Sequence, residues 1–156
     1  MNIFRGQFID TYRGEIITLK EAEVRVERNT SKGKASYLYD LDKNVLDDDD
    51  EEEEDDKKKE KDFYVVDGEK FGGPTRFINH SCDPNLGQYV VSLNKYDEKL
   101  YELAFFALTD IPANTELTFD YLDKDDDPDD ADTKNDDKDG VRCYCGSAKC
   151  RKWLWR

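Results

Sequence analysis

The cysteine pattern is the feature that most constrains how this chain of 156 residues can fold. Cys143, Cys145 and Cys150 lie within eight residues, in the string CYCGSAKC, and the one other cysteine is Cys82. Neighbouring thiolates repel one another, a shared cation relieves that repulsion, and four sulfurs complete the tetrahedron that Zn²⁺ prefers. A disulfide pair or unrelated thiols are the alternatives, although cysteines two residues apart have poor disulfide geometry. A structural zinc ion on all four sulfurs would fasten the C-terminal tail to the middle of the chain.

Two segments carry more than the whole formal net charge of −14. Asp47–Asp56 consists of ten consecutive acidic residues, and residues 123–139 hold ten aspartates against three lysines. Adjacent carboxylates repel one another and bury nothing, so both segments are expected to be solvated insertions, with a plain charged linker as the simplest interpretation. Alternatively, they steer a basic partner by long-range attraction. The remainder of the chain is mildly basic, holds nearly all the aromatic residues, and reads as one compact domain.

The chain has no apolar run long enough to span a membrane, and its N-terminal string MNIFRGQFID lacks a signal-peptide core. We therefore expect an intracellular protein, in which cysteines are more commonly metal-binding thiolates than disulfides.

Short strands dominate the expected secondary structure. Thr18 and Glu21 form a capping-box pattern ahead of one short amphipathic helix at 19–29. Apolar alternation predicts the strands. They are expected within 6–17 (with a turn at Arg13-Gly14) and at 37–41, 63–66, 86–93, 103–108 and 116–119.

Three motifs in a fixed order identify a family resemblance. RFINHSCDPN at 76–85 precedes ELTFDY at 116–121, and C-x-C-x4-C follows. This set resembles the catalytic SET domain and post-SET tail of protein-lysine methyltransferases, and the longer strings around it are most similar to the fungal heterochromatin enzymes that methylate lysine 9 of histone H3. The resemblance implies a mainly β SET fold of several small sheets with a knot-like C-terminal arrangement. It divides the chain into a SET domain at 1–122 with an acidic insert at about 47–62, an acidic linker at 123–140, and a zinc-binding tail at 141–156.

The resemblance also assigns roles to individual positions. It implies S-adenosylmethionine as the cofactor and Zn²⁺ as a structural metal. The matching positions are Tyr37, Arg76, Asn79, His80 and Trp155 for cofactor binding, Tyr121 and Phe119 for the catalytic centre, and Cys82, Cys143, Cys145 and Cys150 for zinc.

Methyl transfer needs an unprotonated amine in line with the S–CH3 bond, at roughly 3–3.5 Å. A narrow aromatic channel beside the sulfonium charge favours the neutral lysine amine. We assign Tyr121 the orienting role and leave deprotonation to solvent. Phe119 lacks a hydroxyl that would hold a water molecule beside the amine, so di- or trimethylation is expected. His80 is the only histidine; a general base is one interpretation, but a structural and cofactor contact is favoured.

The predicted partner is the histone H3 tail or nucleosome, in the nucleus on chromatin, with a role in heterochromatin formation and gene silencing. No membrane association and no sequence-specific nucleic-acid binding are expected. A catalytically inactive SET-type histone-binding module and an acidic histone chaperone are the alternatives. Family members usually carry a G-x-G strand and a cysteine-rich pre-SET module ahead of the region that begins near Arg5, so this chain alone is expected to be weakly active or inactive.

Overall fold

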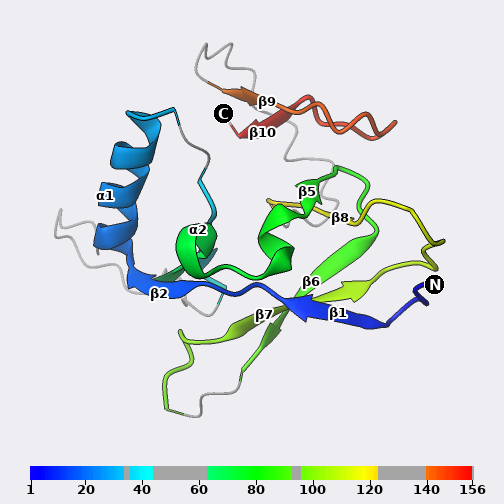
Figure 1. The fold of residues 1–156 in the computed structure, drawn as a ribbon, viewed down its shortest axis with the longest axis horizontal. Helices are drawn as coiled ribbons and strands as arrows, with labels where there is room; N and C mark the ends of the chain where they lie inside the picture. Colours follow the sequence, from blue (N-terminus) through cyan, green and yellow to red (C-terminus); the bar gives the residue numbers. More distant parts are fainter. Residues whose placement is uncertain (34–35, 44–62, 93–95, 123–139, 156) are drawn as a thin grey trace, which may run out of the picture. The chain divides into compact units, whose positions relative to one another are not determined.

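The computed structural model describes residues 1–33, 36–43, 63–92, 96–122 and 140–155, without the side chain of Trp155 (Figure 1). The expected acidic insert at 47–62 and nearly all of the expected linker at 123–140 lie outside the described residues. The chain divides into two compact units. We call residues 11–76 and 90–104 the helix unit, and residues 1–10, 77–89 and 105–156 the tail unit.

The helix unit contains a three-stranded antiparallel sheet in the order β2-β4-β3. These strands are β2 (Glu15–Thr18), β3 (Leu38–Leu41) and β4 (Tyr64–Asp67). The predicted strands at 37–41 and 63–66 are thereby confirmed to within one residue at each end. Branched and apolar side chains suit this pleated surface. Ile17 lies opposite Val65 in the register, and both side chains are buried.

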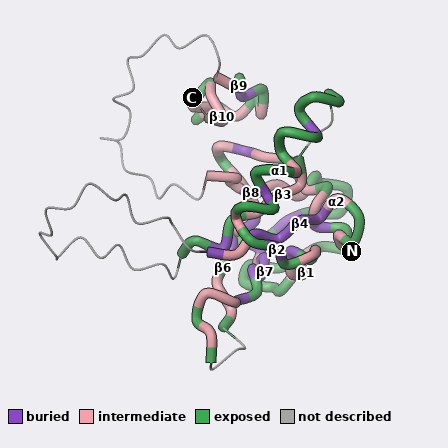
Figure 2. Tube along the Cα trace, turned by 90° about the vertical axis from the view of Figure 1, so that its left-hand side faces the viewer, coloured by how far each residue is buried: buried purple, intermediate pink, exposed green. Residues whose placement is uncertain are grey.

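The predicted helix is confirmed as α1 (Leu19–Thr30), which follows β2 directly (Figure 1). Thr18 is its N-cap, and the Thr18 hydroxyl accepts a hydrogen bond from the backbone N–H of Glu21 at 3.3 Å. Most of α1 is exposed, and it buries Ala22 and Asn29 (Figure 2). Ala22 joins an apolar cluster between helix and sheet, whose other members are Ile17, Phe63 and Val65, with Leu19 and Leu38 packed against them.

Two further helical turns follow β4, in a region where no helix was predicted. They are α2 (Gly68–Phe71) and the 3-10 turn η1 (Pro74–Phe77). Asp67 is the N-cap of α2, because its side chain accepts a hydrogen bond from the backbone N–H of Glu69. A Cβ atom at Gly72 would lie 2.3 Å from the carbonyl oxygen of Gly68, so only glycine fits after this turn.

The tail unit pairs short strands that are distant in the sequence. β5 (Asn79–His80) runs parallel to β8 (Thr118–Phe119). β9 (Val141–Arg142) runs antiparallel to β10 (Trp153–Trp155). Leu86, Phe105, Ile111 and Phe119 are buried in this unit.

A second three-stranded sheet has residues in both units. Its order is β1-β7-β6, from β1 (Phe8–Thr11), β6 (Leu86–Val91) and β7 (Glu102–Ala107). β1 and β6 lie inside predicted segments, and β7 begins one residue before the predicted segment 103–108. Among the described residues, no helix combines the length and the apolar composition that crossing a membrane requires.

Leu41 tests whether the β2-β4-β3 core holds the helix unit together. Its side chain is fully buried, so Leu41→Ala is expected to lower the free energy of unfolding by about 2–5 kcal/mol, because the cavity collapses only in part. Urea unfolding followed by circular dichroism measures this loss. Leu108→Ala, at a position 37% exposed, is the matched control and should cost about 1 kcal/mol or less. Equal losses of unfolding free energy in the two variants would contradict the claim that the β2-β4-β3 core holds the helix unit together.

Candidate active site and metal centre

The parallel β5–β8 pair brings the two longest motifs together in the tail unit. Asn79 is in register with Thr118, and His80 with Phe119. Asn85 fastens the second motif by its side chain, which donates to the carbonyl oxygen of Glu116 at 2.8 Å and accepts from the backbone N–H of Thr118 at 2.9 Å. The sequence analysis singled out neither Asn85 nor Glu116, although both lie inside the motifs.

An aromatic cluster forms at the end of β8. The ring centroids of Phe119 and Tyr121 lie 4.8 Å apart, those of Phe105 and Phe119 lie 4.8 Å apart, and those of His80 and Tyr121 lie 5.3 Å apart. The Tyr121 hydroxyl donates its proton to the carbonyl oxygen of Ile78 at 2.8 Å. A hydroxyl whose only proton is committed in this way can act toward any further group only as an acceptor.

Both ring nitrogens of His80 have close partners. Nδ1 accepts a hydrogen bond from the backbone N–H of Tyr121 at 3.2 Å, and Nε2 lies 3.2 Å from the sulfur of Cys82. An accepting Nδ1 places the proton of a neutral imidazole on Nε2. Burial lowers the pKa of His80, and Arg151 adds to this, although the Asp120 carboxylate opposes it. A buried, doubly engaged ring is poorly suited to taking up a substrate proton, which favours a structural role over a general base.

Sulfur atoms gather beside this ring. The Cys82 and Cys143 sulfurs lie 3.7 Å apart, close to the roughly 3.8 Å edge of a tetrahedron with 2.3 Å zinc–sulfur bonds. The ligand atoms of His80, Cys82, Cys143 and Cys145 all lie within 4.8 Å of one another. The Cys150 sulfur does not belong to that group, and it lies 3.8 Å from the carbonyl oxygen of Cys143. Three of the four predicted zinc ligands are therefore together, and Cys150 is close by.

The thiols differ in their protonation. Burial raises the pKa of Cys143 to about 12 and also raises that of Cys82. Burial acts on Cys145 as well, but hydrogen bonds from the backbone N–H groups of Cys82 and Ser147 outweigh it and lower the pKa of Cys145 to about 5. Backbone N–H groups of Arg151 and Lys152 point at two further sulfurs, those of Cys82 and Cys150, each at 3.4 Å. Donors directed at sulfur are what a thiolate metal centre needs.

An ion pair ties the tail to the ELTFDY motif. Arg151 binds the Asp120 carboxylate with both terminal nitrogens, at 2.5 and 2.7 Å. Burial alone would raise the pKa of Asp120, but the hydrogen bonds from Arg151 and from the backbone N–H of Leu122 lower it. No role was predicted for Arg151, although it directly follows the predicted zinc ligand Cys150.

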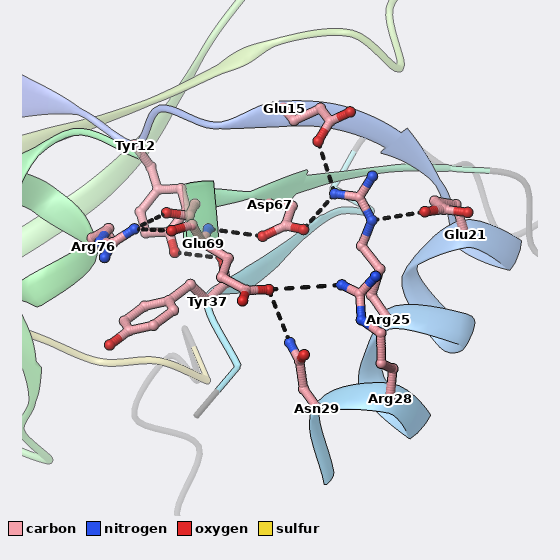
Figure 3. A network of polar contacts seen from close by, with 11 residues as sticks. Tyr12, Glu15, Glu21, Arg25, Arg28, Asn29, Tyr37, Asp67, Glu69 and Arg76 are labelled. Carbon is pink, nitrogen blue, oxygen red and sulfur yellow. Dashed lines mark hydrogen bonds and ion pairs between the residues drawn. The ribbon is translucent and has the colours of Figure 1, made fainter. Parts of the chain in front are cut away.

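In the helix unit, the predicted cofactor residues Tyr37 and Arg76 contact each other. The Arg76 guanidinium carbon lies 4.6 Å from the centre of the Tyr37 ring. Tyr12, which the sequence analysis overlooked, donates from its hydroxyl to the carbonyl oxygen of Tyr37 at 2.8 Å (Figure 3). Tyr12 lies just before the predicted Arg13-Gly14 turn, a position where side chains at a strand end commonly contribute to sites.

Of the remaining predicted residues, Asn79 is exposed and its side-chain amide donates to Glu116 at 2.7 Å. Trp155 is the last residue of β10, and its side chain lies outside the described part of the chain. The geometry thus gathers Asn79, His80, Phe119, Tyr121 and three cysteines in the tail unit, and Tyr37 with Arg76 in the helix unit. The roles of these residues stay predictions.

Comparison with known proteins identifies the family of the chain. Residues 1–122 match the SET domain. Over 166 residues the chain is 44% identical to "Histone-lysine N-methyltransferase, H3 lysine-9 specific dim-5" of Neurospora crassa, covering 99% of this chain and 46% of that protein. Over 161 residues it is 43% identical to "Histone-lysine N-methyltransferase, H3 lysine-9 specific KMT1" of Fusarium mangiferae, covering 99% of this chain and 44% of that protein.

A solved structure, from work on the structural basis for the product specificity of histone lysine methyltransferases, superposes with a TM-score of 0.72 at 41% identity. That match covers 99% of this chain and 49% of the other. The chain therefore belongs to the SET domain family, and the predicted mainly β SET fold is confirmed. It spans less than half the length of the Neurospora and Fusarium relatives. The knot-like arrangement of the C-terminal segment stays a prediction.

Asp120→Asn tests the ion pair between the motif and the tail. Removing a charge-assisted, largely buried pair is expected to cost about 1.5–3 kcal/mol of unfolding free energy at pH 7. Because the pKa of Asp120 is lowered in the folded state, this contribution is complete above about pH 4 and disappears as the pH falls through the lowered value. Urea unfolding at several pH values measures it.

The matched control for this substitution is Asp83→Asn. Asp83 pairs with Lys149 at 3.0 Å, but its side chain is 53% exposed, so its loss should cost about 1 kcal/mol or less. If the two variants lose the same stability at pH 7, the Asp120–Arg151 pair is no stronger than a surface contact.

Proposed function

We propose that this chain is the catalytic portion of an S-adenosylmethionine-dependent protein-lysine N-methyltransferase, with lysine 9 of histone H3 as its target. The observation that carries the proposal is the aromatic cluster of Phe119 and Tyr121, packed against His80 and directly beside the sulfur group. Membership of the SET family supports it, as do the H3 lysine-9-specific names of the relatives. On this proposal the chain acts in the nucleus, on chromatin, in heterochromatin formation and gene silencing.

The chemistry follows from the site's own groups. When bound, the cofactor supplies an electrophilic methyl group on a sulfonium. A target lysine amine attacks only when neutral, and an aromatic wall lowers its proton affinity because a charged ammonium is poorly solvated there. The Tyr121 hydroxyl, whose proton is committed to Ile78, accepts a hydrogen bond from the amine and aligns it. With the cofactor bound, the N–C bond would form as the S–C bond breaks, and the proton of the amine would leave to solvent.

Further assignments rest on the family resemblance. Tyr37, Arg76, Asn79, His80 and Trp155 contact the cofactor. Residues 1–122 are the SET domain, 123–140 a linker and 141–156 a post-SET tail. Phe119 is buried and brings no hydroxyl to the site, so the site has room for repeated transfer and yields di- or trimethyllysine.

The metal proposal is a structural zinc ion held by Cys82, Cys143, Cys145 and Cys150. The 3.7 Å spacing of the Cys82 and Cys143 sulfurs and the lowered pKa of Cys145 support it. A closed four-sulfur site leaves no position for a catalytic water. Zinc would thus fasten residues 143–150 to the β5–β8 pair, and the aromatic residues would carry the chemistry.

Transfer of a labelled methyl group to a histone H3 peptide tests the catalytic proposal. The chain is assayed alone and joined to the part of the Neurospora relative that it does not cover, with cofactor affinity measured in parallel. The joined form is expected to modify lysine 9, and mass spectrometry should find two or three added methyl groups. Tyr121→Phe should lower kcat about 10- to 100-fold with little change in cofactor affinity, because it removes only the orienting oxygen.

The control is Tyr89→Phe, the same change at a tyrosine 50% exposed, which should leave kcat unchanged. Transfer to a peptide with arginine in place of the target lysine should be absent. A joined form that binds histone peptide but neither binds nor uses S-adenosylmethionine would instead favour the non-catalytic histone-binding module.

Metal content tests the zinc proposal. The purified chain should retain about one zinc ion per molecule, and a strong chelator should lower its melting temperature, because metal bound only by the folded state stabilises that state. Cys143→Ser and Cys150→Ser should each lose the metal, whereas Ser147→Ala should keep it. The opposite result, zinc retained in Cys150→Ser and lost in His80→Asn, would make His80 the fourth ligand and contradict the four-sulfur site.

A further inference from the structure

Arg25 in α1 is held by three carboxylates (Figure 3). Its Nη1 donates to Glu15 at 2.8 Å and to Asp67 at 2.6 Å, and its Nε donates to Glu21 at 2.8 Å. The side chains of Glu15 and Glu21 are more than 40% exposed, whereas that of Asp67 is 5% exposed. The Arg25–Asp67 pair is therefore the strongly coupled one, because exposed pairs are screened by water.

Asp67 uses its two carboxylate oxygens for two purposes. Oδ2 accepts from Arg25, and Oδ1 accepts from the backbone N–H of Glu69 at 2.8 Å, which caps the N-terminus of α2. A capping side chain fixes where a helical turn begins and which way it points. Arg25 thus holds the carboxylate that starts α2.

The first turn of α2 in turn holds the two predicted cofactor residues. The Gly68 N–H donates to the carbonyl oxygen of Tyr37 at 3.0 Å, and the carbonyl oxygens of Gly68 and Glu69 both accept from Nη1 of Arg76. Gly68 is closely packed, since a Cβ atom at this position would lie 3.3 Å from the Tyr12 hydroxyl oxygen and 3.4 Å from the Cβ of Arg76. These bonds orient the Arg76 guanidinium over the Tyr37 ring.

We propose that Arg25 is a positioning residue for S-adenosylmethionine binding: through Asp67 and the first turn of α2, it fixes the Tyr37–Arg76 pair. This inference rests on the proposed function, in which that pair contacts the cofactor. Arg25 itself touches neither residue of the pair in the contacts described above. Its effect is on the geometry of the pair, and through that on cofactor affinity.

A second connection between α1 and α2 provides the contrast. Asn29 donates to the Glu69 carboxylate at 3.1 Å, and Arg28 lies 3.9 Å from the same carboxylate. These contacts hold the side chain of Glu69, whereas Arg25 acts on the cap of the helix. Loss of Arg28 should therefore leave the Tyr37–Arg76 pair in place.

The test is isothermal titration of S-adenosylmethionine into Arg25→Gln, in the full chain and in the joined form, at a temperature well below the unfolding of either. Glutamine has similar helix propensity and keeps the stem but not the charge. The dissociation constant is expected to rise about tenfold, the cost of about 1.4 kcal/mol. Arg25→Lys, which keeps the charge without the planar fork, should restore part of the affinity.

Three control variants accompany Arg25→Gln: one makes the same substitution at a neighbouring arginine, and two remove other partners of Arg25. Arg28→Gln makes the same change one turn away at a side chain 44% exposed, and its dissociation constant should stay within about twofold of the parent, because surface pairs contribute little. Glu15→Gln and Glu21→Gln each remove another partner of Arg25 and leave Asp67 paired, so they should lower thermal stability slightly and leave the affinity unchanged.

Asp67→Asn covers the case in which Arg25→Gln fails to fold. An asparagine still caps the helix, but it no longer attracts Arg25, so cofactor affinity should again fall about tenfold. A folded Arg25→Gln or Asp67→Asn variant with lowered melting temperature and unchanged affinity would overturn the inference and leave Arg25 a purely structural residue. If neither unmodified form binds S-adenosylmethionine, the proposed function itself fails and this inference fails with it.

Discussion

The parallel pairing of Asn79-His80 with Thr118-Phe119 is the constraint on which the candidate site depends. Only two residues from each strand take part, yet they join two motifs that are nearly 40 positions apart in the sequence. The ring of Tyr121 packs against the rings of Phe119 and His80. Cys82, two residues beyond β5, lies within reach of the tail sulfurs. A two-residue strand pair is not stable by itself. The side-chain hydrogen bonds of Asn85 and the contacts from the tail are therefore needed to stabilise the β5–β8 pair.

The tail contributes order in three chemically distinct ways. Its sulfurs cluster with Cys82, its backbone N–H groups point at sulfur, and Arg151 binds Asp120, which lies between the predicted catalytic residues Phe119 and Tyr121. Burial raises the pKa of Cys143, whereas burial of Cys145 is outweighed by backbone N–H donors, which lower its pKa. Metal binding would remove the remaining protons and make the thiols equivalent as ligands. On the proposed function, such a centre would organise its surroundings and leave methyl transfer to the aromatic residues.

The pattern of apolar and polar residues predicted the helices and strands that are long enough for this pattern to repeat. The capping pattern at Thr18 and the apolar alternation around Val65 indicated α1 and β4 within one residue. The two-residue β5 and the single turn of α2 have no such period, and only pairing partners distant in the sequence define them. The cysteine spacing correctly indicated that the tail returns to Cys82, because few other arrangements satisfy thiolates so close together.

Side-chain partners were harder to foresee than elements. Arg25 lies on a largely exposed helix whose charged residues resemble those of a solvent-facing helix. Its sequence neighbours do not indicate that it binds Asp67, 42 residues away. Likewise, the backbone N–H of Tyr121 reaches Nδ1 of His80 only once β5 and β8 have paired. Family resemblance indicated which positions matter, and the contacts explain how several of them are held.

X-ray absorption at the zinc edge of the purified chain tests the central claim most directly, because it reports the atoms around the metal without reference to activity. The account predicts a four-coordinate shell dominated by sulfur at about 2.3 Å, and its loss when Cys82 is replaced by serine. A shell of nitrogen and oxygen at about 2.0–2.2 Å, or a sulfur shell that survives without Cys82, would mean that the tail does not close onto the β5–β8 pair through a shared metal.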